Sequence, residues 1–328
     1  MTATKTTKVA TKPATTKKRV VVPKIKRLAE VPDKARFYDG YINRQVPGGE
    51  LDFEAFEKAR LMLHNVLIEG PTGSGKTHSV YAYAAWSGMP LYSVSSSINT
   101  EPSQLFGRFV PDESKPGTYR WQDGPVTDIV RHGGVLLINE VNFIPERIST
   151  VLFGLLDTRK KIELQDHMGE VIYAPTDGSF LLIADMNPDY EGTRPLNKAF
   201  RNRFASKLYF DYDPVIEAQL VISKALLNVA GKLRDQIRQG VYDTPVSTNM
   251  LVEFEEYAIA SGLDRAIDNF ANSFPFDDHK SVQTVFDTIR SNLAGDYSKY
   301  QADDVADPDT VQANGDDWGL DDIDWDKN

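Results

Sequence analysis

A glycine-rich stretch, Gly70-Pro-Thr-Gly-Ser-Gly-Lys-Thr77, has residue types and spacing suited to phosphate chemistry. It follows a short apolar run at residues 66–68 and precedes an alanine-rich segment, the order typical of a strand, a phosphate-binding loop and a helix. Glycines let successive backbone N–H groups face an anion, and the helix N-terminus adds its dipole. In this pattern Lys76 reaches the β- and γ-phosphates, and the Thr77 hydroxyl binds Mg²⁺. The stretch predicts a nucleoside-triphosphate site.

The predicted nucleotide-binding residues comprise the whole loop and the start of the helix: Gly70, Pro71, Thr72, Gly73, Ser74, Gly75, Lys76, Thr77 and His78. The competing interpretation is a glycine-rich turn that matches by accident. The strand and helix patterns on either side of the loop argue against it. The chain contains no guanine-reading Asn-Lys-x-Asp, which favours ATP as the nucleotide.

A second chemical signal is Asn139-Glu140, which follows the apolar residues 135–138. Four apolar residues without alternation predict a strand buried on both faces of a parallel sheet. Its carboxyl end is where open α/β sheets bind ligands. Phosphate-loop NTPases usually have an Asp here for the Mg²⁺ shell, and a following Glu can orient or deprotonate the attacking water. We expect Glu140 to act as the base. Asn139 brings no negative charge, which predicts weaker Mg²⁺ binding or slower turnover.

Two further segments are predicted around these elements. Residues 180–184 indicate another buried strand, and it ends in Asp185-Met186-Asn187-Pro188, where a polar side chain could contact the γ-phosphate or the water. Alternating aromatics between Gly107 and Gly124 predict a hairpin. This hairpin is interpreted either as a surface feature with exposed aromatics or as a loop that grips a partner.

Composition limits the class of protein. The chain has 328 residues and 41% hydrophobic side chains, which favours about two domains with a sizeable core. No run approaches the roughly 18 apolar residues of a membrane span, and no secretory signal opens the chain. We therefore expect no membrane contact and a cytoplasmic location. The chain has no Cys, which excludes disulfides, thiolate zinc sites and cysteine nucleophiles, and five scattered His do not favour a structural metal.

The two ends carry opposite charges. Residues 1–28 hold seven Lys and two Arg without an acid, a net +9, and residues 301–328 hold ten Asp against one Lys, a net −9. These charges cancel, so the rest of the chain carries the formal net charge of −10. Both ends are too polar to offset ordering entropy, which predicts disordered tails. The basic arm is either simply solvated or a contact for nucleic acid or another polyanion. The acidic tail is interpreted as a docking segment or an inert one.

A set of motifs along the chain carries a family resemblance. After the phosphate loop come Trp-x-Asp-Gly-Pro at 121–125, Asn-Glu-Val-Asn at 139–142, Met-Asn-Pro at 186–188, Gly-Thr-Arg-x-Leu at 192–196 and Arg-Asn-Arg-Phe at 201–204. This set resembles the AAA+ ATPases of the MoxR group, within the dynein-related branch that contains CobS, NorQ, CbbQ and GvpN. The resemblance is strong over residues 37–212 and weak over residues 213–294.

The resemblance implies a phosphate-loop NTPase fold of class α/β, in which helices sandwich a parallel sheet and a small α-helical lid domain follows. Four parts are expected along the chain: a basic disordered arm at residues 1–36, an α/β ATPase core at 37–212, a helical lid at 213–300 and an acidic disordered tail at 301–328. Helical patterning at residues 216–227, 250–260 and 282–293 agrees with the lid.

The resemblance also implies roles by position. Lys76 and Thr77 match the Walker A pair, and Asn139 with Glu140 occupies the Walker B position. Thr77 and Asn139 are then the residues that face Mg²⁺. Asn187 matches sensor 1, the polar residue that contacts the γ-phosphate or the water.

A further implication is a shared site between subunits. Arg203, with Arg201 as the second candidate, looks like the arginine finger that is offered to the neighbouring subunit's ATP. A finger supplied in trans requires a head-to-tail ring, expected to be a hexamer. Asn249 stands where relatives often have a sensor-2 Arg. Asn139 therefore replaces a negative charge and Asn249 a positive charge of the family pattern. Either the two losses of charge compensate each other, or the site binds ATP and hydrolyses it slowly.

The function expected from these features is a Mg²⁺-dependent ATPase that works as a ring motor and remodels or activates a partner protein. In this family the client is often a protein with a von Willebrand A domain. Two alternatives stay open. One is a nucleic-acid-associated ATPase of the helicase-loader or packaging type that uses the basic arm, although an acidic body repels phosphates. The other is a nucleotide-gated adaptor with little hydrolysis.

Overall fold

The structure is a computed structural model that describes residues 28–95, 97, 99–188, 196–298 and 300. The predictions made for residues 1–27 and for the acidic tail at 301–328 lie outside the described residues, as does most of the Gly-Thr-Arg-x-Leu motif. None of the helices in the described part of the chain is long and apolar enough to cross a bilayer.

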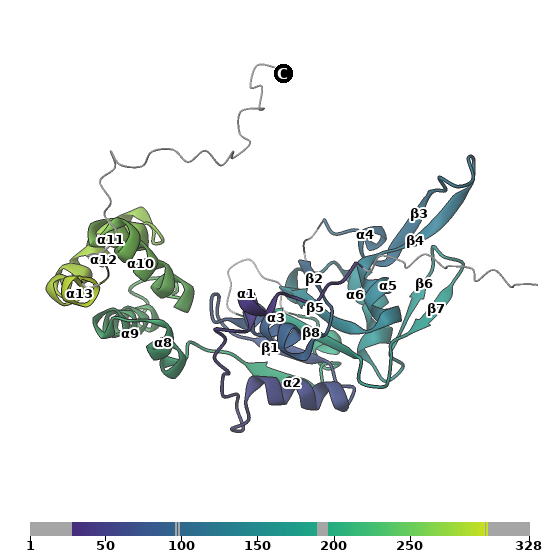
Figure 1. The fold of residues 1–328 in the computed structure, drawn as a ribbon, viewed down its shortest axis with the longest axis horizontal. Coiled ribbons are helices and arrows are strands. Elements are labelled where there is room, and N and C mark those ends of the chain that lie inside the picture. The colour runs from purple at the N-terminus through teal and green to yellow at the C-terminus, as the bar shows by residue number, and fades with distance from the viewer. Residues whose placement is uncertain (1–27, 96, 98, 189–195, 299, 301–328) are drawn as a thin grey trace, which may run out of the picture.

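A parallel five-stranded sheet forms the centre of the molecule (Figure 1). Its strand order is β2-β5-β8-β1-β9, and every neighbouring pair is parallel. The strands are β1 (Val66–Glu69), β2 (Leu91–Ser95), β5 (Gly134–Asn139), β8 (Phe180–Met186) and β9 (Ser206–Tyr209). The central strands are almost wholly apolar because helices cover both faces of the sheet. The predicted α/β fold is confirmed.

Alternate side chains of the strands enter two different cores. Leu136 and Ile138 pack with the helices of one face, whereas Val135 and Leu137 pack with those of the other. The helices of the first face are α5 (Pro125–His132) and α6 (Glu146–Leu156), and those of the second are α2 (Asp52–Leu61) and α3 (Lys76–Ser87). This arrangement fixes the carboxyl edge of the sheet, where ligands bind in such folds.

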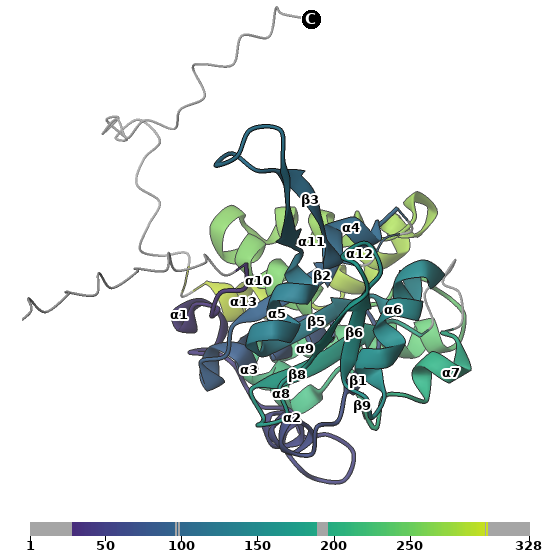
Figure 2. The same cartoon turned by 90° about the vertical axis from the view of Figure 1, so that its right-hand side faces the viewer.

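Two antiparallel hairpins extend from the core, and Figure 2 shows one of them projecting away from the sheet. The first consists of β3 (Gly107–Pro111) and β4 (Tyr119–Asp123) and follows α4 (Pro102–Phe106), in agreement with the predicted aromatic hairpin. The second consists of β6 (Lys161–Leu164) and β7 (Glu170–Tyr173), and sequence patterns did not predict it. Two short helices complete the core, namely η1 (Val141–Phe143) and α7 (Lys198–Arg201).

Residues 28–36 lie against the core, in place of the disordered arm that we expected up to residue 36. Ala29 is buried, Glu30 forms a bridge to Leu91, and the Leu28 N–H donates to the Asp128 carboxylate over 3.3 Å. The helix α1 (Lys34–Phe37) follows directly. Sequence composition could not reveal that these residues contact the core, because the contact depends on pairing with an edge strand far along the chain.

The C-terminal part is helical and has its own apolar core (Figure 1). Its helices are α8 (Pro214–Leu220), α9 (Lys224–Arg238), α10 (Thr248–Ser261), α11 (Leu263–Ala271), η2 (Phe276–Asp278), α12 (His279–Asp287) and α13 (Arg290–Tyr297). The helical patterning at residues 216–227 proves to be two helices. The break arises because Ser223 caps α9, and the buried Glu255 carboxylate accepts the N–H groups of Ile222 and Ser223 over 2.8 and 2.9 Å.

Candidate nucleotide site

The phosphate loop joins β1 to α3, as its sequence predicts, and close approach explains two of its glycines. A Cβ on Gly70 would lie 1.9 Å from the Phe210 carbonyl oxygen. A Cβ on Gly73, whose φ is +67°, would lie 2.5 Å from the Ser247 Cβ at the start of α10. The loop is therefore held tightly between the last sheet strand and the C-terminal helices.

Lys76 is buried and folded back over the loop. Its Nζ donates to the carbonyl oxygens of Gly70 and Pro71 over 2.9 and 2.7 Å and to the Asn187 Oδ1 over 2.6 Å. Burial lowers the pKa of Lys76 to about 8, although the nearby carboxylates of Asp185 and Glu140 favour its charged form. The structure thus brings the predicted Walker A lysine and the predicted sensor 1 residue into direct contact.

The predicted Walker B pair ends β5. Asn139 donates from Nδ2 to the Ser93 hydroxyl over 2.7 Å, and its Oδ1 is buried without a hydrogen-bond partner in the described part of the chain. Glu140 has a left-handed backbone with φ +50°, which turns the chain out of the strand. Left-handed backbone at a non-glycine residue costs free energy and is typical of functional sites.

Asp185, on the neighbouring strand β8, connects these parts. Its Oδ2 accepts the Thr77 hydroxyl over 2.9 Å, and its Oδ1 accepts the Glu140 N–H over 2.7 Å. The side chain is only 2% exposed, and burial raises its pKa. The sequence predicts a polar contact at this strand end and points to Asn187, but it does not single out Asp185. Its position directly after an apolar strand run was the available signal.

The residues present fit Mg²⁺ that arrives with a nucleotide. Mg²⁺ prefers oxygen ligands and is commonly held by one or two side chains together with substrate phosphates. The Thr77 hydroxyl and the unpartnered Asn139 Oδ1 are such oxygens. No group of three or more His, Asp or Glu in the described residues could hold a metal ion alone. The nucleotide itself must then complete the coordination.

A pocket of about 130 Å³ opens between the phosphate loop and the C-terminal helices. It is lined by Gly40, Tyr41, Ile42, Arg44, Gly73, Ser74, Gly75, His78, Ile216, Leu220, Thr248 and Asn249. Its lining combines apolar side chains with a few polar groups beside the phosphate loop. His78, predicted as a nucleotide-binding residue, lies in this wall, and burial lowers its pKa. Asn249, at the predicted sensor-2 position, lies there as well.

Arg44 is a buried residue of this site that sequence reasoning missed. Its guanidinium donates to the Ser74 carbonyl over 2.8 Å and to the Asp211 carbonyl, and it lies over the Phe210 ring. It therefore ties the N-terminal segment to the phosphate loop and to the chain that leaves β9. The turn-rich composition around Arg44 carried no sign of these contacts.

The two candidate finger arginines have partners within the chain. Arg201 forms a bidentate ion pair with Glu69, the residue before the phosphate loop, over 2.7 and 2.9 Å. Arg203 donates to the Ala199 carbonyl over 2.7 Å and stacks on the Phe153 ring at 4.3 Å.

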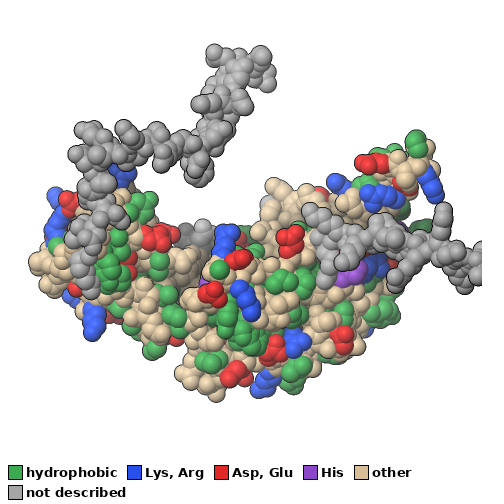
Figure 3. Space-filling model, viewed as in Figure 1, with side chains coloured by type: hydrophobic (Ala, Val, Ile, Leu, Met, Phe, Trp, Pro, Cys, Tyr) green, Lys and Arg blue, Asp and Glu red, His purple; other side chains and the backbone are tan. Residues whose placement is uncertain are grey.

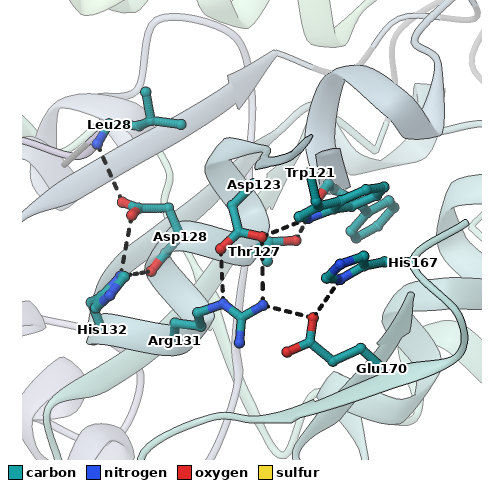
Figure 4. Close-up of polar contacts among 10 residues, drawn as sticks. Leu28, Trp121, Asp123, Thr127, Asp128, Arg131, His132, His167 and Glu170 are labelled. Atoms are coloured by element: carbon teal, nitrogen blue, oxygen red, sulfur yellow. Dashed lines mark hydrogen bonds and ion pairs between the residues drawn. The ribbon is translucent and has the colours of Figure 1, made fainter. Parts of the chain in front are cut away.

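The two hairpins are joined to each other beside α5 (Figure 4). Arg131 donates to Asp123 of β4 and to Glu170 of β7, each over 2.8 Å. The Trp121 and His167 rings stack with centroids 4.5 Å apart and an interplanar angle of 9°. A displacement of one hairpin would therefore be transmitted to the other.

The parallel sheet and the loop that joins β1 to α3 define a phosphate-loop fold of the AAA+ kind. The family described as "AAA domain (dynein-related subfamily)" matches residues 65–204. The chain belongs to this family and is a MoxR-like AAA+ protein.

Three relatives are similar over most of the chain. Protein NorQ of Paracoccus denitrificans is 33% identical over 239 residues, 68% of this chain and 84% of the relative. Denitrification regulatory protein NirQ of Pseudomonas aeruginosa is 31% identical, with 74% of this chain and 95% of the relative covered. Protein CbbQ of Hydrogenophilus thermoluteolus is 34% identical, with 61% and 76% covered.

Proposed function

We propose that the protein binds and hydrolyses ATP with Mg²⁺ and works as a ring-forming motor, a hexamer, that remodels or activates a partner protein. The observation that carries the proposal is the convergence of Lys76, Asn187, Glu140 and Thr77 where the adjacent strands β1, β8 and β5 end. Membership of a family of AAA+ ATPases supports the same activity.

Each of these residues has a chemical task in hydrolysis. Lys76 exchanges the Gly70 and Pro71 carbonyls for the β- and γ-phosphate oxygens when ATP binds. Glu140 orients the attacking water and accepts its proton. Asn187 hydrogen-bonds the γ-phosphate or the water as the charge develops. Mg²⁺ held at Thr77 together with the nucleotide neutralises phosphate charge.

The ring follows from the proposed finger. Arg203, or Arg201, acts on the ATP of the neighbouring subunit, and a head-to-tail contact that closes forms a ring. Arginine fingers are worth about 10³ to 10⁵ in turnover in related NTPases. The ion pair of Arg201 with Glu69 would link the finger helix to the phosphate loop of its own chain, so that one site senses its neighbour.

The hairpins offer a surface for the partner. Several apolar side chains along the hairpins are exposed: Phe109, Tyr119, Met168 and Tyr173 are 48%, 70%, 92% and 65% exposed. Exposed apolar groups gathered on projecting elements mark interaction sites. By analogy with the relatives, one of which is named a denitrification regulatory protein, we propose a protein client, of the kind that carries a von Willebrand A domain.

Nucleic acid is less favoured as the client of the described residues. Acidic and basic side chains are interspersed on the face shown in Figure 3, which therefore offers no continuous basic path for a phosphate backbone. The basic arm at residues 1–27 lies outside the described residues. Salt-sensitive DNA binding that disappears when residues 1–28 are deleted would support this alternative.

The test is ATP hydrolysis per chain, measured with Mg²⁺ over a wide range of protein concentration. We expect the rate per chain to rise with concentration, because the site is completed by a neighbour. The Glu140→Gln variant should bind ATP and lack hydrolysis. ATP binding without hydrolysis at any concentration would overturn the motor and favour the nucleotide-gated adaptor.

A further inference from the structure

Asp185 occupies the strand between the two strands that carry the nucleotide motifs. In the parallel register, Asp185 pairs with Ile68 of β1, two residues before the phosphate loop. On the other side of β8, Ala184 pairs with Ile138 of β5. Asp185 and Asn139, which follow these two residues, therefore lie at the same level of the sheet. The carboxylate of Asp185 and the amide of Asn139 thus end neighbouring strands at the same edge of the sheet.

The hydrogen bonds of Asp185 are those expected of a residue that holds a metal-bound nucleotide. Its Oδ2 accepts the hydroxyl of Thr77, the predicted metal-binding residue of the phosphate loop, over 2.9 Å. Its Oδ1 accepts the backbone N–H of Glu140 over 2.7 Å. Phosphate-loop NTPases combine a loop Ser or Thr with a strand-end carboxylate to hold Mg²⁺. Here the strand-end carboxylate in contact with the loop hydroxyl comes from β8.

Asn139 cannot supply the missing charge. Its amide is neutral, its Nδ2 is used by the Ser93 hydroxyl over 2.7 Å, and its Oδ1 is buried without a partner in the described residues. Asp185, in contrast, is 2% exposed and ionisable, and it accepts hydrogen bonds from a hydroxyl and from a backbone N–H, neither of which carries a full charge. A buried carboxylate is costly unless a cation compensates it. Lys76 lies close enough to act on Asp185 electrostatically, but its hydrogen bonds go to two carbonyls and to Asn187, so it forms no direct ion pair with the carboxylate.

We propose that Asp185 replaces the Walker B aspartate: the carboxylate that holds Mg²⁺ with the nucleotide has moved from β5 to the adjacent position on β8. Asn139 then contributes only an amide oxygen beside it. This transposition keeps one negative charge at the site and avoids two neighbouring buried carboxylates, which would repel each other. The inference rests on one part of the proposed function, the binding of a nucleotide with Mg²⁺. It does not require hydrolysis.

The test is the binding of a non-hydrolysable ATP analogue by calorimetry, with Mg²⁺ and with EDTA. In the wild type we expect Mg²⁺ to strengthen binding. In Asp185→Asn the ratio of the affinity with Mg²⁺ to the affinity in EDTA should be about 10- to 100-fold smaller than in the wild type. This is the usual effect of removing a carboxylate that supports a metal. Its affinity in EDTA should change by no more than about twofold, since Asn retains the Oδ1 acceptor for Glu140. Asp166→Asn, which removes one exposed carboxylate elsewhere, is the matched control.

The double variant Asn139→Asp/Asp185→Asn separates a metal role from a structural one. It returns the charge to β5 and should recover the Mg²⁺-dependent gain that Asp185→Asn lost. Equal losses in Mg²⁺ and in EDTA, or a double variant no better than the single one, would overturn the proposal. If Asp185→Asn does not fold, the charge-conserving double variant must fold and respond to Mg²⁺, or the proposal fails.

The outcomes also distinguish this inference from the proposed motor. A wild type that responds to Mg²⁺ through Asp185 but never hydrolyses ATP would overturn the motor and support the inference. Hydrolysis with a Mg²⁺ response that is unchanged in Asp185→Asn would support the motor and overturn the inference. A wild type that binds the analogue equally with and without Mg²⁺ would also overturn the inference.

Discussion

The Nζ of Lys76 donates a hydrogen bond of 2.6 Å to the Oδ1 of Asn187. The contact joins the helix that follows the phosphate loop to the end of β8, 111 residues later in the chain. A nucleotide that draws Lys76 onto its phosphates must therefore also change the environment of Asn187. Nucleotide binding and the position of the amide that we propose as catalytic are therefore coupled through this bond.

Asn187→Ala should separate binding from turnover. The variant removes one hydrogen-bond partner of Lys76 and leaves Lys76 itself to bind the phosphates, so ATP affinity should change by a few-fold only, while turnover should fall about 10²-fold because one transition-state hydrogen bond is lost. Steady-state hydrolysis and equilibrium ATP binding measure the two quantities. Asn292→Ala on the exposed side of α13 is the control. Unchanged turnover in Asn187→Ala would remove Asn187 from the catalytic residues.

Gly73→Ala should weaken ATP binding by about tenfold, because its Cβ would lie 2.5 Å from the Ser247 Cβ and force the loop away from α10. Gly88→Ala is a matched control. Gly88 has a similar φ of +69°, with nothing within 4 Å of an added Cβ. Both variants should lose about 1–2 kcal/mol of stability through left-handed backbone. Gly73→Ala should lose more than Gly88→Ala because of the clash with Ser247, and only Gly73→Ala should lose affinity. Equal ATP affinities in the two variants would contradict the close approach.

Glu170 should make stability depend on pH in the acid range. Its hydrogen bond with the Arg131 guanidinium lowers the pKa of Glu170 from 4.5 to about 2. A lowered pKa means that the contribution is complete above pH 4.5 and is lost as pH falls toward 2. The difference in free energy of unfolding between wild type and Glu170→Gln should therefore be constant from pH 7 to about 5.5 and shrink below it. A difference that stays constant down to pH 3 would show that the ion pair contributes nothing.

Mixed rings should reveal the arginine finger. Arg203→Ala should lose about 10³ in turnover if Arg203 acts on a neighbour. Mixing Arg203→Ala with Glu140→Gln should restore part of the hydrolysis, because some sites then combine an intact Glu140 with an intact Arg203 from the adjacent chain. The same experiment with Arg201→Ala tests the second candidate. If neither mixture recovers activity and both arginine variants remain fully active alone, the shared site is refuted.

Local residue patterns were sufficient for much of the fold. The glycine spacing of the phosphate loop, the apolar runs that become β1, β5 and β8, and the aromatic hairpin were each predictable, because each depends on residues close together in the chain. The family, too, was predictable from the order of its motifs. The second hairpin β6–β7 and the order of residues 28–36 were missed, because both depend on packing against distant segments.

Short-range spacing along the chain is enough to predict a phosphate loop and, at the Walker B position, a pair that begins with Asn139. Which other side chains meet these residues depends on the three-dimensional fold. Asp185 meets Thr77 across 108 residues, and Arg44 meets Ser74 across 30 residues. Such contacts arise from strand order in a parallel sheet, which brings the carboxyl ends of distant strands together and is not encoded in any local pattern.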